Sequence, residues 1–221
     1  MKNKLASKKN VTAFINLSGG VDSAYYLWRW LNENKGNDKK ILVHHCLFLK
    51  RRRKEEKEAC DKILNFLNSK NLINFIPVET EMKKGTLRGR TLDIEMLCGM
   101  ASIVVKLYPN IKDVLLPYSQ EETSSLHEHL KSGGTINTYD PNHRYYFVNK
   151  VMELITGRQF NYIFYPDGEE GGLVSKREMI QEMPQELFEM TWYCRRPVNG
   201  EVCGKCHTCR KVQRALKVVK K

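Results

Sequence analysis

The sequence lacks any run of about eighteen apolar residues, the length that a helix needs to cross a bilayer, so it predicts no membrane span. The N-terminal segment MKNKLASKKN is basic, but no apolar stretch follows it, so we expect no secretory signal peptide. Internal repeats are also absent. These absences favour a soluble, cytoplasmic protein. A length of 221 residues, 41% of them hydrophobic, suits one domain with a small appendage.

Acidic residues are scarce relative to basic ones. The chain has 25 Asp and Glu against 37 Lys and Arg, which gives a net charge of +12 at pH 7. Such an excess attracts nucleotides, nucleic acid or acidic membranes, or it serves solubility alone. The run KRRRK at 50–54 has the same two interpretations. It contacts phosphates, or it is a solvated helix face balanced by Glu55, Glu56 and Glu58.

Short apolar segments alternate with segments of helical periodicity over most of the chain. The candidate strands are 11–16, 41–49, 74–79, 113–119 and 162–166. The candidate helices are 23–33, 50–69, 90–108, 175–184 and 184–190. This alternation predicts an α/β fold with a central parallel sheet of about five strands and helices on both faces. The polar stretch 120–160 is either a long loop or a set of short helices.

A glycine-rich string joins the first candidate strand to the first candidate helix: Ser18-Gly19-Gly20-Val21-Asp22-Ser23. Loops at this edge of an open parallel sheet meet ligands. Gly19 and Gly20 let the backbone approach a ligand, and the loop amides with the helix start form an anion cradle. Ser18 and Ser23 add hydroxyl donors, and Asp22 caps the helix or orients bound magnesium. The string is not a Walker loop, because no Gly-Lys-Ser/Thr follows. The alternative is an ordinary strand–helix turn, which the full string between a strand and a helix disfavours.

Seven cysteines without a signal peptide argue against a disulfide framework. Four of them share the spacing C-x8-C-x2-C-x2-C: Cys194, Cys203, Cys206 and Cys209. Zinc favours four thiolates in a tetrahedron, so this spacing predicts a closed, structural Zn²⁺ site, whereas a redox C-x-x-C pair fits it poorly. His207 lies between two of these cysteines and is either a bystander, which is the favoured interpretation, or a competing ligand. The other three lie in apolar segments and are predicted to be buried thiols: Cys46, Cys60 and Cys98.

The string SGGVDS resembles the PP-loop of ATP pyrophosphatases. Together with SKREMI, TWYC and CGKCHTC, it resembles the 7-cyano-7-deazaguanine synthases of the QueC type, and the segment 173–209 is the more specific part. The resemblance implies an adenine-nucleotide α-hydrolase-like (Rossmann-like) domain over 1–190 and a C-terminal zinc-binding element over 191–221 packed on it. It also implies a homodimer, and conversion of 7-carboxy-7-deazaguanine, ammonia and ATP into the nitrile through an adenylated carboxylate and an amide. The product feeds queuosine and related 7-deazaguanine modifications.

The resemblance also assigns roles to residues. It implies that the whole string Ser18–Ser23 binds ATP with Mg²⁺, and that the catalytic candidates are Asp22, Lys176 and Arg90. Lys176, in SKREMI, matches a family lysine that would clamp pyrophosphate; the alternative is a solvated lysine at a helix start. Arg90, in RGRT, matches the arginine of a family Gly-Arg-Asn segment and would meet a phosphate or the substrate carboxylate. Its alternative is a surface arginine. Adenine would lie near residues 43–46.

Three segments depart from the family. Its Gly-Arg-Asn is Gly89-Arg90-Thr91 here, Cys46-Leu47-Phe48 stands where Asp-Tyr-Gly-Gln is expected, and SQEETSSLHEHL replaces Tyr-Pro-Asp-Cys. Two further functions therefore stay open. One is a PP-loop enzyme that adenylates another carboxylate or acts on a nucleic-acid or protein target. The other is a non-catalytic module that binds nucleic acid or protein. Basic residues around the predicted zinc site keep nucleic acid open as a partner: Lys205, Arg210, Lys211, Arg214 and Lys217.

Overall fold

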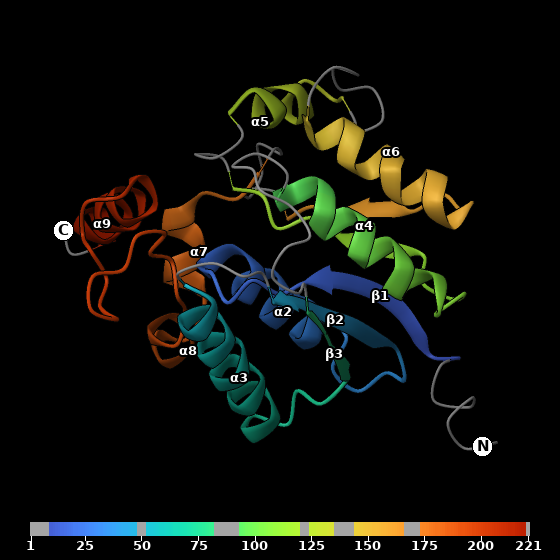
Figure 1. Cartoon of the computed structure of the whole chain (residues 1–221), viewed down its shortest axis with the longest axis horizontal. Helices are drawn as coiled ribbons and strands as arrows, with labels where there is room; N and C mark the ends of the chain where they lie inside the picture. The colour runs from blue at the N-terminus through green and yellow to red at the C-terminus, as the bar shows by residue number, and fades with distance from the viewer. Residues whose placement is uncertain are drawn as a thin grey trace.

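A parallel sheet of five strands lies at the centre of the residues described by the computed structural model, which are 9–47, 52–81, 93–119, 124–134, 144–165 and 173–219 (Figure 1). The strands are β1 (Val11–Asn16), β2 (Lys40–Leu47), β3 (Phe75–Glu81), β4 (Asp113–Leu115) and β5 (Asn161–Ile163). Their spatial order is β3-β2-β1-β4-β5, and every pairing is parallel. The strand order therefore reverses between β1 and β4, where open α/β sheets bind their ligands.

Helices cover both faces of this sheet (Figure 1). Their bounds are α2 (Val21–Glu33), α3 (Arg53–Ser69), α4 (Asp93–Lys106), α5 (Ser124–Lys131), α6 (Arg144–Thr156), α7 (Lys176–Glu182), α8 (Gln185–Glu189) and α9 (His207–Val219). Neighbouring side chains of a strand point to opposite faces, so Ile15 joins the core under α2 and α3, whereas Phe14 joins the core under α4 and α6. The predicted α/β fold with a five-stranded parallel sheet is confirmed.

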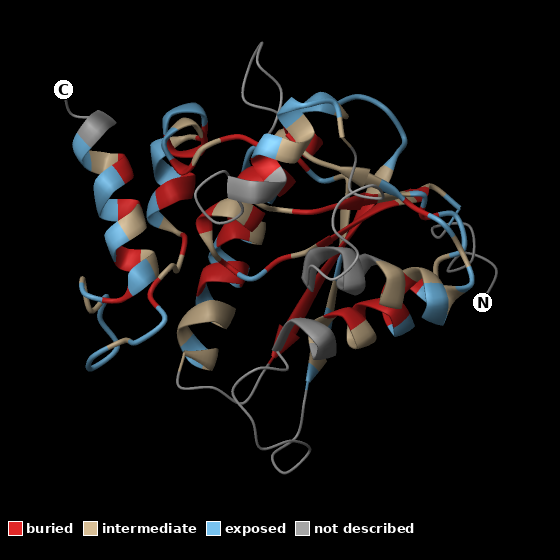
Figure 2. Cartoon of the chain, turned by 90° about the horizontal axis from the view of Figure 1, so that it is seen from above, coloured by how far each residue is buried: buried red, intermediate tan, exposed pale blue. Residues whose placement is uncertain are grey.

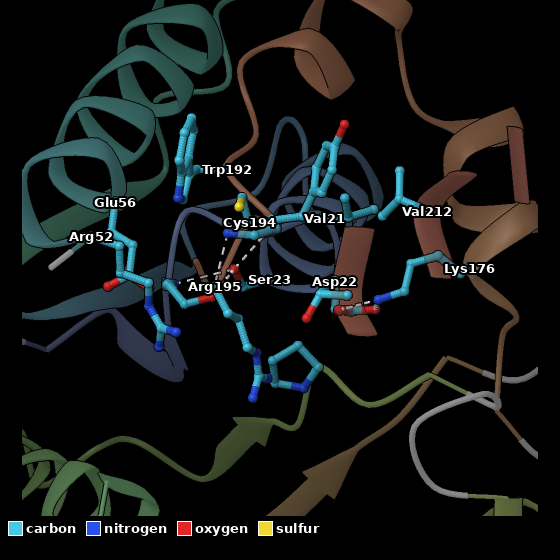
Figure 3. Close-up of a pocket in the computed structure, with 15 residues that line it drawn as sticks. Val21, Asp22, Ser23, Arg52, Glu56, Lys176, Trp192, Cys194, Arg195 and Val212 are labelled. Atoms are coloured by element: carbon cyan, nitrogen blue, oxygen red, sulfur yellow. Dashed lines mark hydrogen bonds and ion pairs between the residues drawn. The ribbon is translucent and has the colours of Figure 1, made fainter. Parts of the chain in front are cut away.

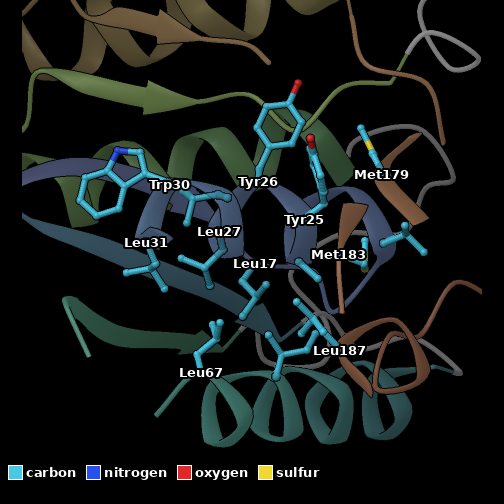
Figure 4. Packing of buried hydrophobic residues seen from close by; sticks show 14 of the residues in the cluster. Leu17, Tyr25, Tyr26, Leu27, Trp30, Leu31, Leu67, Met179, Met183 and Leu187 are labelled. Carbon is cyan, nitrogen blue, oxygen red and sulfur yellow. The ribbon is translucent and has the colours of Figure 1, made fainter. Parts of the chain in front are cut away.

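Helix α2 lies in the middle of the larger core (Figure 4). Its residues Tyr25, Tyr26 and Leu27 are fully buried, and Figure 4 shows them in one cluster with Met179, Met183 and Leu187 from the segment of α7 and α8. The hydroxyl groups of both tyrosines form hydrogen bonds. Tyr25 donates to Glu182 Oε2 at 2.5 Å, and Tyr26 donates to the Tyr118 carbonyl at 3.0 Å. These bonds join α2 to α7 and to the segment after β4, so the elements that form the site are attached to one helix.

The structure differs from the prediction mainly beyond residue 113. Strand β4 has three residues rather than seven, because Pro117 has no N–H to continue the ladder. The polar stretch contains helices α5 and α6, so short helices were the correct alternative within its described residues. Helix α9 was not predicted at all. Its buried stripe is Cys209, Val212 and Ala215, a weakly apolar set in a strongly basic segment.

No helix in the described ranges is long and apolar enough to cross a membrane.

Candidate active site and cysteine cluster

The loop between β1 and α2 is held in one conformation by its neighbours. Gly19 has φ +75°, a region that residues with a Cβ rarely adopt. A Cβ there would lie 2.9 Å from the Glu56 carbonyl oxygen and 3.0 Å from Ala59 Cβ, both on α3. On the other side, the Trp192 N–H donates to the Gly19 carbonyl at 2.7 Å. The loop is thus clamped between α3 and the segment that precedes Cys194.

Serine hydroxyls close the loop internally. Ser23 Oγ donates to the Gly20 carbonyl at 3.2 Å and accepts from the Ser18 N–H at 3.2 Å. The Ser18 and Ser23 hydroxyls lie 3.1 Å apart. Gly20 caps α2 with no side-chain hydrogen bond, so the first amides of this helix are not occupied by a side-chain cap. Val21 begins the helix and is buried, which leaves the backbone and hydroxyls of the loop as an anion-binding surface.

Lys176 is the first residue of α7 and leaves only 2% of its side chain exposed. Its Nζ lies 2.5 Å from each carboxylate oxygen of Asp22, in the first turn of α2 (Figure 3). The N-terminus of α7 is fixed by a capping box between Ser175 and Glu178. Burying two charges costs several kcal/mol per ion, on the order of what their attraction returns, so such a pair contributes little net stability. Its position in a cavity beside the glycine-rich loop favours a role in binding.

A cavity of about 200 Å³ lies against this loop (Figure 3). It is bounded by the loop, the start of α3, Lys176, and the segment from Trp192 to Arg195. Arg52, which directly precedes α3, and Glu56 of α3 form an ion pair on one wall. Sites that enclose a whole small ligand usually hold about 300–1,000 Å³. The cavity therefore suits the phosphates of a nucleotide rather than the complete molecule.

A second cavity, of about 570 Å³, lies between α3 and strands β2 and β3. Its walls include Val43 and His45, within the segment where the family resemblance places adenine. His45 Nδ1 lies 2.8 Å from the Leu17 carbonyl oxygen, so in the neutral ring this nitrogen carries the proton. The carbonyl of Leu17 thereby fixes the imidazole beside the glycine-rich loop.

The four C-terminal cysteines converge on one point. Their sulfur atoms all lie within 4.8 Å of one another. A tetrahedral zinc ion with Zn–S bonds of about 2.3 Å requires sulfurs about 3.8 Å apart, and the Cys203–Cys209 and Cys206–Cys209 separations are 3.9 and 3.3 Å. The backbone N–H of Cys203 donates to Cys194 Sγ at 3.3 Å, and the N–H of Cys206 donates to Cys203 Sγ at 3.3 Å. The donor set fits a single metal ion.

The electrostatics of this cluster favour at least one thiolate. Burial raises the pKa of Cys206, but hydrogen bonds from the backbone of Arg195 and Cys209 outweigh it and lower that pKa to about 6. His207 is exposed and lies outside the group of four sulfurs. The remaining cysteines, Cys46, Cys60 and Cys98, are buried, as predicted.

The structure brings the predicted residues into two adjoining groups. Lys176 and all of the loop residues 18–23 except Gly19 line the first cavity. Cys194 of the cysteine cluster lines the same cavity. Arg90 lies outside the described residues. Sequence reasoning missed Arg195 and Trp192, which line the cavity directly beside a predicted metal ligand. It left Arg52 undecided as part of the run KRRRK, and this arginine also lines the cavity.

No family model matches the chain. No curated protein matches it in sequence either. A similar solved structure is the U34-tRNA thiolase NcsA from Methanococcus maripaludis with its [4Fe-4S] cluster. It is 10% identical to this chain, the alignment covers 93% of this chain and 81% of that one, and the TM-score is 0.42.

Proposed function

We propose that the chain is an ATP pyrophosphatase that adenylates a carboxylate. One observation carries this proposal: the glycine-rich anion cradle and the buried Lys176–Asp22 pair meet at a single cavity, at the strand edge where the sheet order reverses. An anion cradle alone would suit any phosphate ligand. A buried lysine beside it, held by a carboxylate, adds the cation and the metal ligand that cleavage between the α and β phosphates requires.

The residues of the site have separate roles in this reaction. The amides of the loop and of the first turn of α2 bind the pyrophosphate, where negative charge develops as the bond breaks. Lys176 exchanges its contact with Asp22 for a phosphate oxygen. Asp22 is then the residue that would hold Mg²⁺, which neutralises charge on the leaving pyrophosphate. Ser18 and Ser23 orient the loop through their mutual contact of 3.1 Å.

The acceptor that we propose is 7-carboxy-7-deazaguanine. Its carboxylate oxygen attacks the α phosphorus of ATP, and pyrophosphate leaves. Ammonia then attacks the acyl carbon and AMP leaves, which yields an amide. The amide oxygen then attacks the α phosphorus of a second ATP and a second pyrophosphate leaves. Loss of AMP and of the remaining N–H protons from the adenylated amide forms the nitrile. The support for this acceptor is the combination of SGGVDS with SKREMI, TWYC and CGKCHTC in one chain, and the position of Lys176 of SKREMI on the loop cavity.

We propose that the cysteine cluster binds Zn²⁺ in a structural role. Four thiolates complete a tetrahedron and leave no open position for a substrate. The close spacing of the sulfurs suits one ion, whereas a four-iron cluster is larger and needs its cysteines further apart. Residues Trp192 and Cys194 connect the cluster to the glycine-rich loop, so the metal element also supports the cavity wall. We further propose a homodimer.

The test is one incubation of metal-loaded protein with Mg-ATP, ammonium and 7-carboxy-7-deazaguanine, analysed by mass spectrometry for AMP and the nitrile. The variants are Ser18→Ala and Lys176→Met, which should both lose AMP formation. Ser132→Ala is the matched control, because Ser132 is exposed at the end of α5 and should leave turnover unchanged.

Each outcome has one meaning. AMP together with nitrile supports the synthase. If AMP forms only with a different carboxylate or with a macromolecular acceptor, the proposed adenylation stands and the proposed substrate is wrong. That outcome would agree with the three altered recognition segments. The proposal would be overturned if folded, metal-loaded protein formed no AMP with 7-carboxy-7-deazaguanine, with other carboxylates or with a macromolecular acceptor.

A further inference from the structure

The positive charge of the chain is concentrated at its C-terminal end. Residues 191–221 contain nine Lys and Arg and one Glu, which amounts to +8 of the net +12. The proposed small-molecule reaction does not need charge at this density, because Lys176 and the loop amides already meet the phosphates of ATP. The segment therefore calls for a separate physical explanation.

Helix α9 displays this charge on one side. Its exposed positions include His207, Arg210, Arg214 and Lys217, spaced three or four residues apart, whereas Cys209, Val212 and Ala215 are buried on the other side. Figure 2 shows the helix that ends at the C-terminus at the edge of the molecule, with exposed residues along its outer side. Successive turns of an α-helix place such side chains about 5.4 Å apart. The cations thus form a row along the helix.

A groove of about 360 Å³ runs beside this row. Its lining consists of Cys206 and seven basic or histidine side chains: Arg195, Arg196, Lys205, His207, Arg210, Lys211 and Arg214. Among the described residues, no carboxylate lines it. Four of the side chains are arginines, whose planar guanidinium forks bind phosphate through two parallel hydrogen bonds.

These cations differ from those elsewhere on the surface. On α3, Arg53 pairs with Glu81 and Lys57 pairs with Asp61, as expected for a solvated helix face. In the described part of the chain, Arg195, Arg196, Arg210 and Arg214 form no ion pair with an acidic side chain. A concentration of unpaired like charges destabilises the folded chain through mutual repulsion, and a polyanion would relieve that repulsion.

The groove adjoins the candidate active site. Arg195 lines both the groove and the loop cavity, where it lies on the same wall as Trp192 and Cys194 (Figure 3). A polyanion in the groove would therefore contact Arg195 on the wall of that cavity. This position suits a ligand that extends across the surface better than it suits a single bound phosphate.

We propose that the α9 groove binds nucleic acid through its phosphodiester backbone. An anionic membrane is the weaker candidate, because surface-binding helices insert an apolar face into the bilayer and the apolar face of α9 is already buried against the protein. A nucleic acid needs only the row of cations that the helix presents. This proposal goes beyond the synthase reaction and does not rest on it, since none of the α9 cations lines the loop cavity.

The test measures binding of fluorescein-labelled 20-nucleotide RNA, single-stranded DNA and duplex DNA by fluorescence anisotropy, on the metal-loaded chain at several salt concentrations. The variant is Arg210→Glu/Arg214→Glu. The control is Lys35→Glu/Lys62→Glu, which changes the net charge equally at exposed positions on other elements. We expect the affinity of the α9 variant to fall roughly tenfold or more and its duplex salt slope to fall by about 2, one for each arginine that no longer binds a phosphate. The affinity of the control should fall less than about threefold.

Four results would overturn the proposal. These are no binding by the wild-type chain, equal decreases in affinity in both variants, tighter binding to vesicles of phosphatidylserine than to any nucleic acid, and loss of bound metal in the α9 variant. The last would mean that the arginines stabilise the cysteine cluster. A neutral variant, Arg210→Gln/Arg214→Gln, controls for misfolding because it removes the two positive charges without adding negative ones. This variant should keep its bound metal and still bind nucleic acid several-fold more weakly than wild type. AMP formation in these variants should stay unchanged, so the two proposals fail separately.

Discussion

Gly19→Ala should destabilise the chain far more than Gly20→Ala, although the two glycines are adjacent. At Gly19 the backbone has φ +75°, and a left-handed conformation costs a residue with a Cβ roughly 1–2 kcal/mol. The new methyl group would also lie 2.9 Å from the Glu56 carbonyl and 3.0 Å from Ala59 Cβ. Overpacking of this kind adds about 1–3 kcal/mol.

Helix α3 cannot easily retreat from such a methyl group, because Ala59 and Cys60 are buried at 4% and 2% exposure. The two costs together give about 2–5 kcal/mol. In a chain of this size each kcal/mol lowers the melting temperature by about 2–4 °C, so we expect a fall of about 4–20 °C.

Gly20 is the matched control. Its nearest contact for a Cβ is Ser18 Oγ at 3.4 Å, an ordinary van der Waals distance, and its φ of −81° suits any residue. Gly20→Ala should change the free energy of unfolding by less than about 1 kcal/mol, because a poorer helix cap is offset by a less flexible unfolded chain. The assay is urea and thermal unfolding of metal-loaded protein followed by circular dichroism. Equal destabilisation by the two substitutions would refute the clamp between the loop and α3.

Three further predictions concern charged and metal-binding groups. Asp22→Leu removes the carboxylate that pairs with the buried ammonium of Lys176 and should cost about 3–5 kcal/mol in urea unfolding. Asp22→Leu/Lys176→Met should recover most of that stability, and an equally unstable double variant would contradict the importance of the pairing. Cys206→Ser should lose bound metal and lower the melting temperature, and Cys98→Ser should keep the wild-type metal content. Burial, with a smaller effect of His45, lowers the pKa of His44 from 6.5 to about 4. Between pH 4 and 6.5 the imidazole of His44 is therefore protonated in the unfolded chain and neutral in the folded chain. Stability should therefore fall as the pH drops from 6.5 towards 4, by up to about 3 kcal/mol, and His44→Asn should flatten that slope.

Strand β2 was predictable because its residues 41–47 are all buried and are apolar except for His44 and His45. An apolar segment of this length between turn residues is typical of a strand that is covered on both faces. The glycine-rich loop and the cysteine cluster could also be predicted from the sequence, because each consists of residues that are close together in the chain. Helix α9 was missed because its buried side uses Cys209 and Ala215 where a typical core helix would place larger side chains.

Contacts between distant segments could not be read from the sequence. The Lys176–Asp22 pair joins residues 154 positions apart, and only the packing of α7 against α2 brings them together. Arg195 shows the same difficulty in another form. In the sequence it is one more cation beside a cysteine, whereas in the structure it separates a phosphate-sized cavity from a basic groove.

The bond from the Trp192 N–H to the Gly19 carbonyl connects the two halves of the site physically. It uses backbone atoms, so it persists whichever side chains occupy those positions, provided that the segment before Cys194 stays in place. The cysteine cluster fixes the far end of that segment, and α3 fixes the other side of the loop. The metal-binding element is therefore best understood as part of the loop's support. A chain that keeps the glycine-rich string but cannot hold its cysteines together should bind phosphates less well, because the loop amides would no longer be held in position.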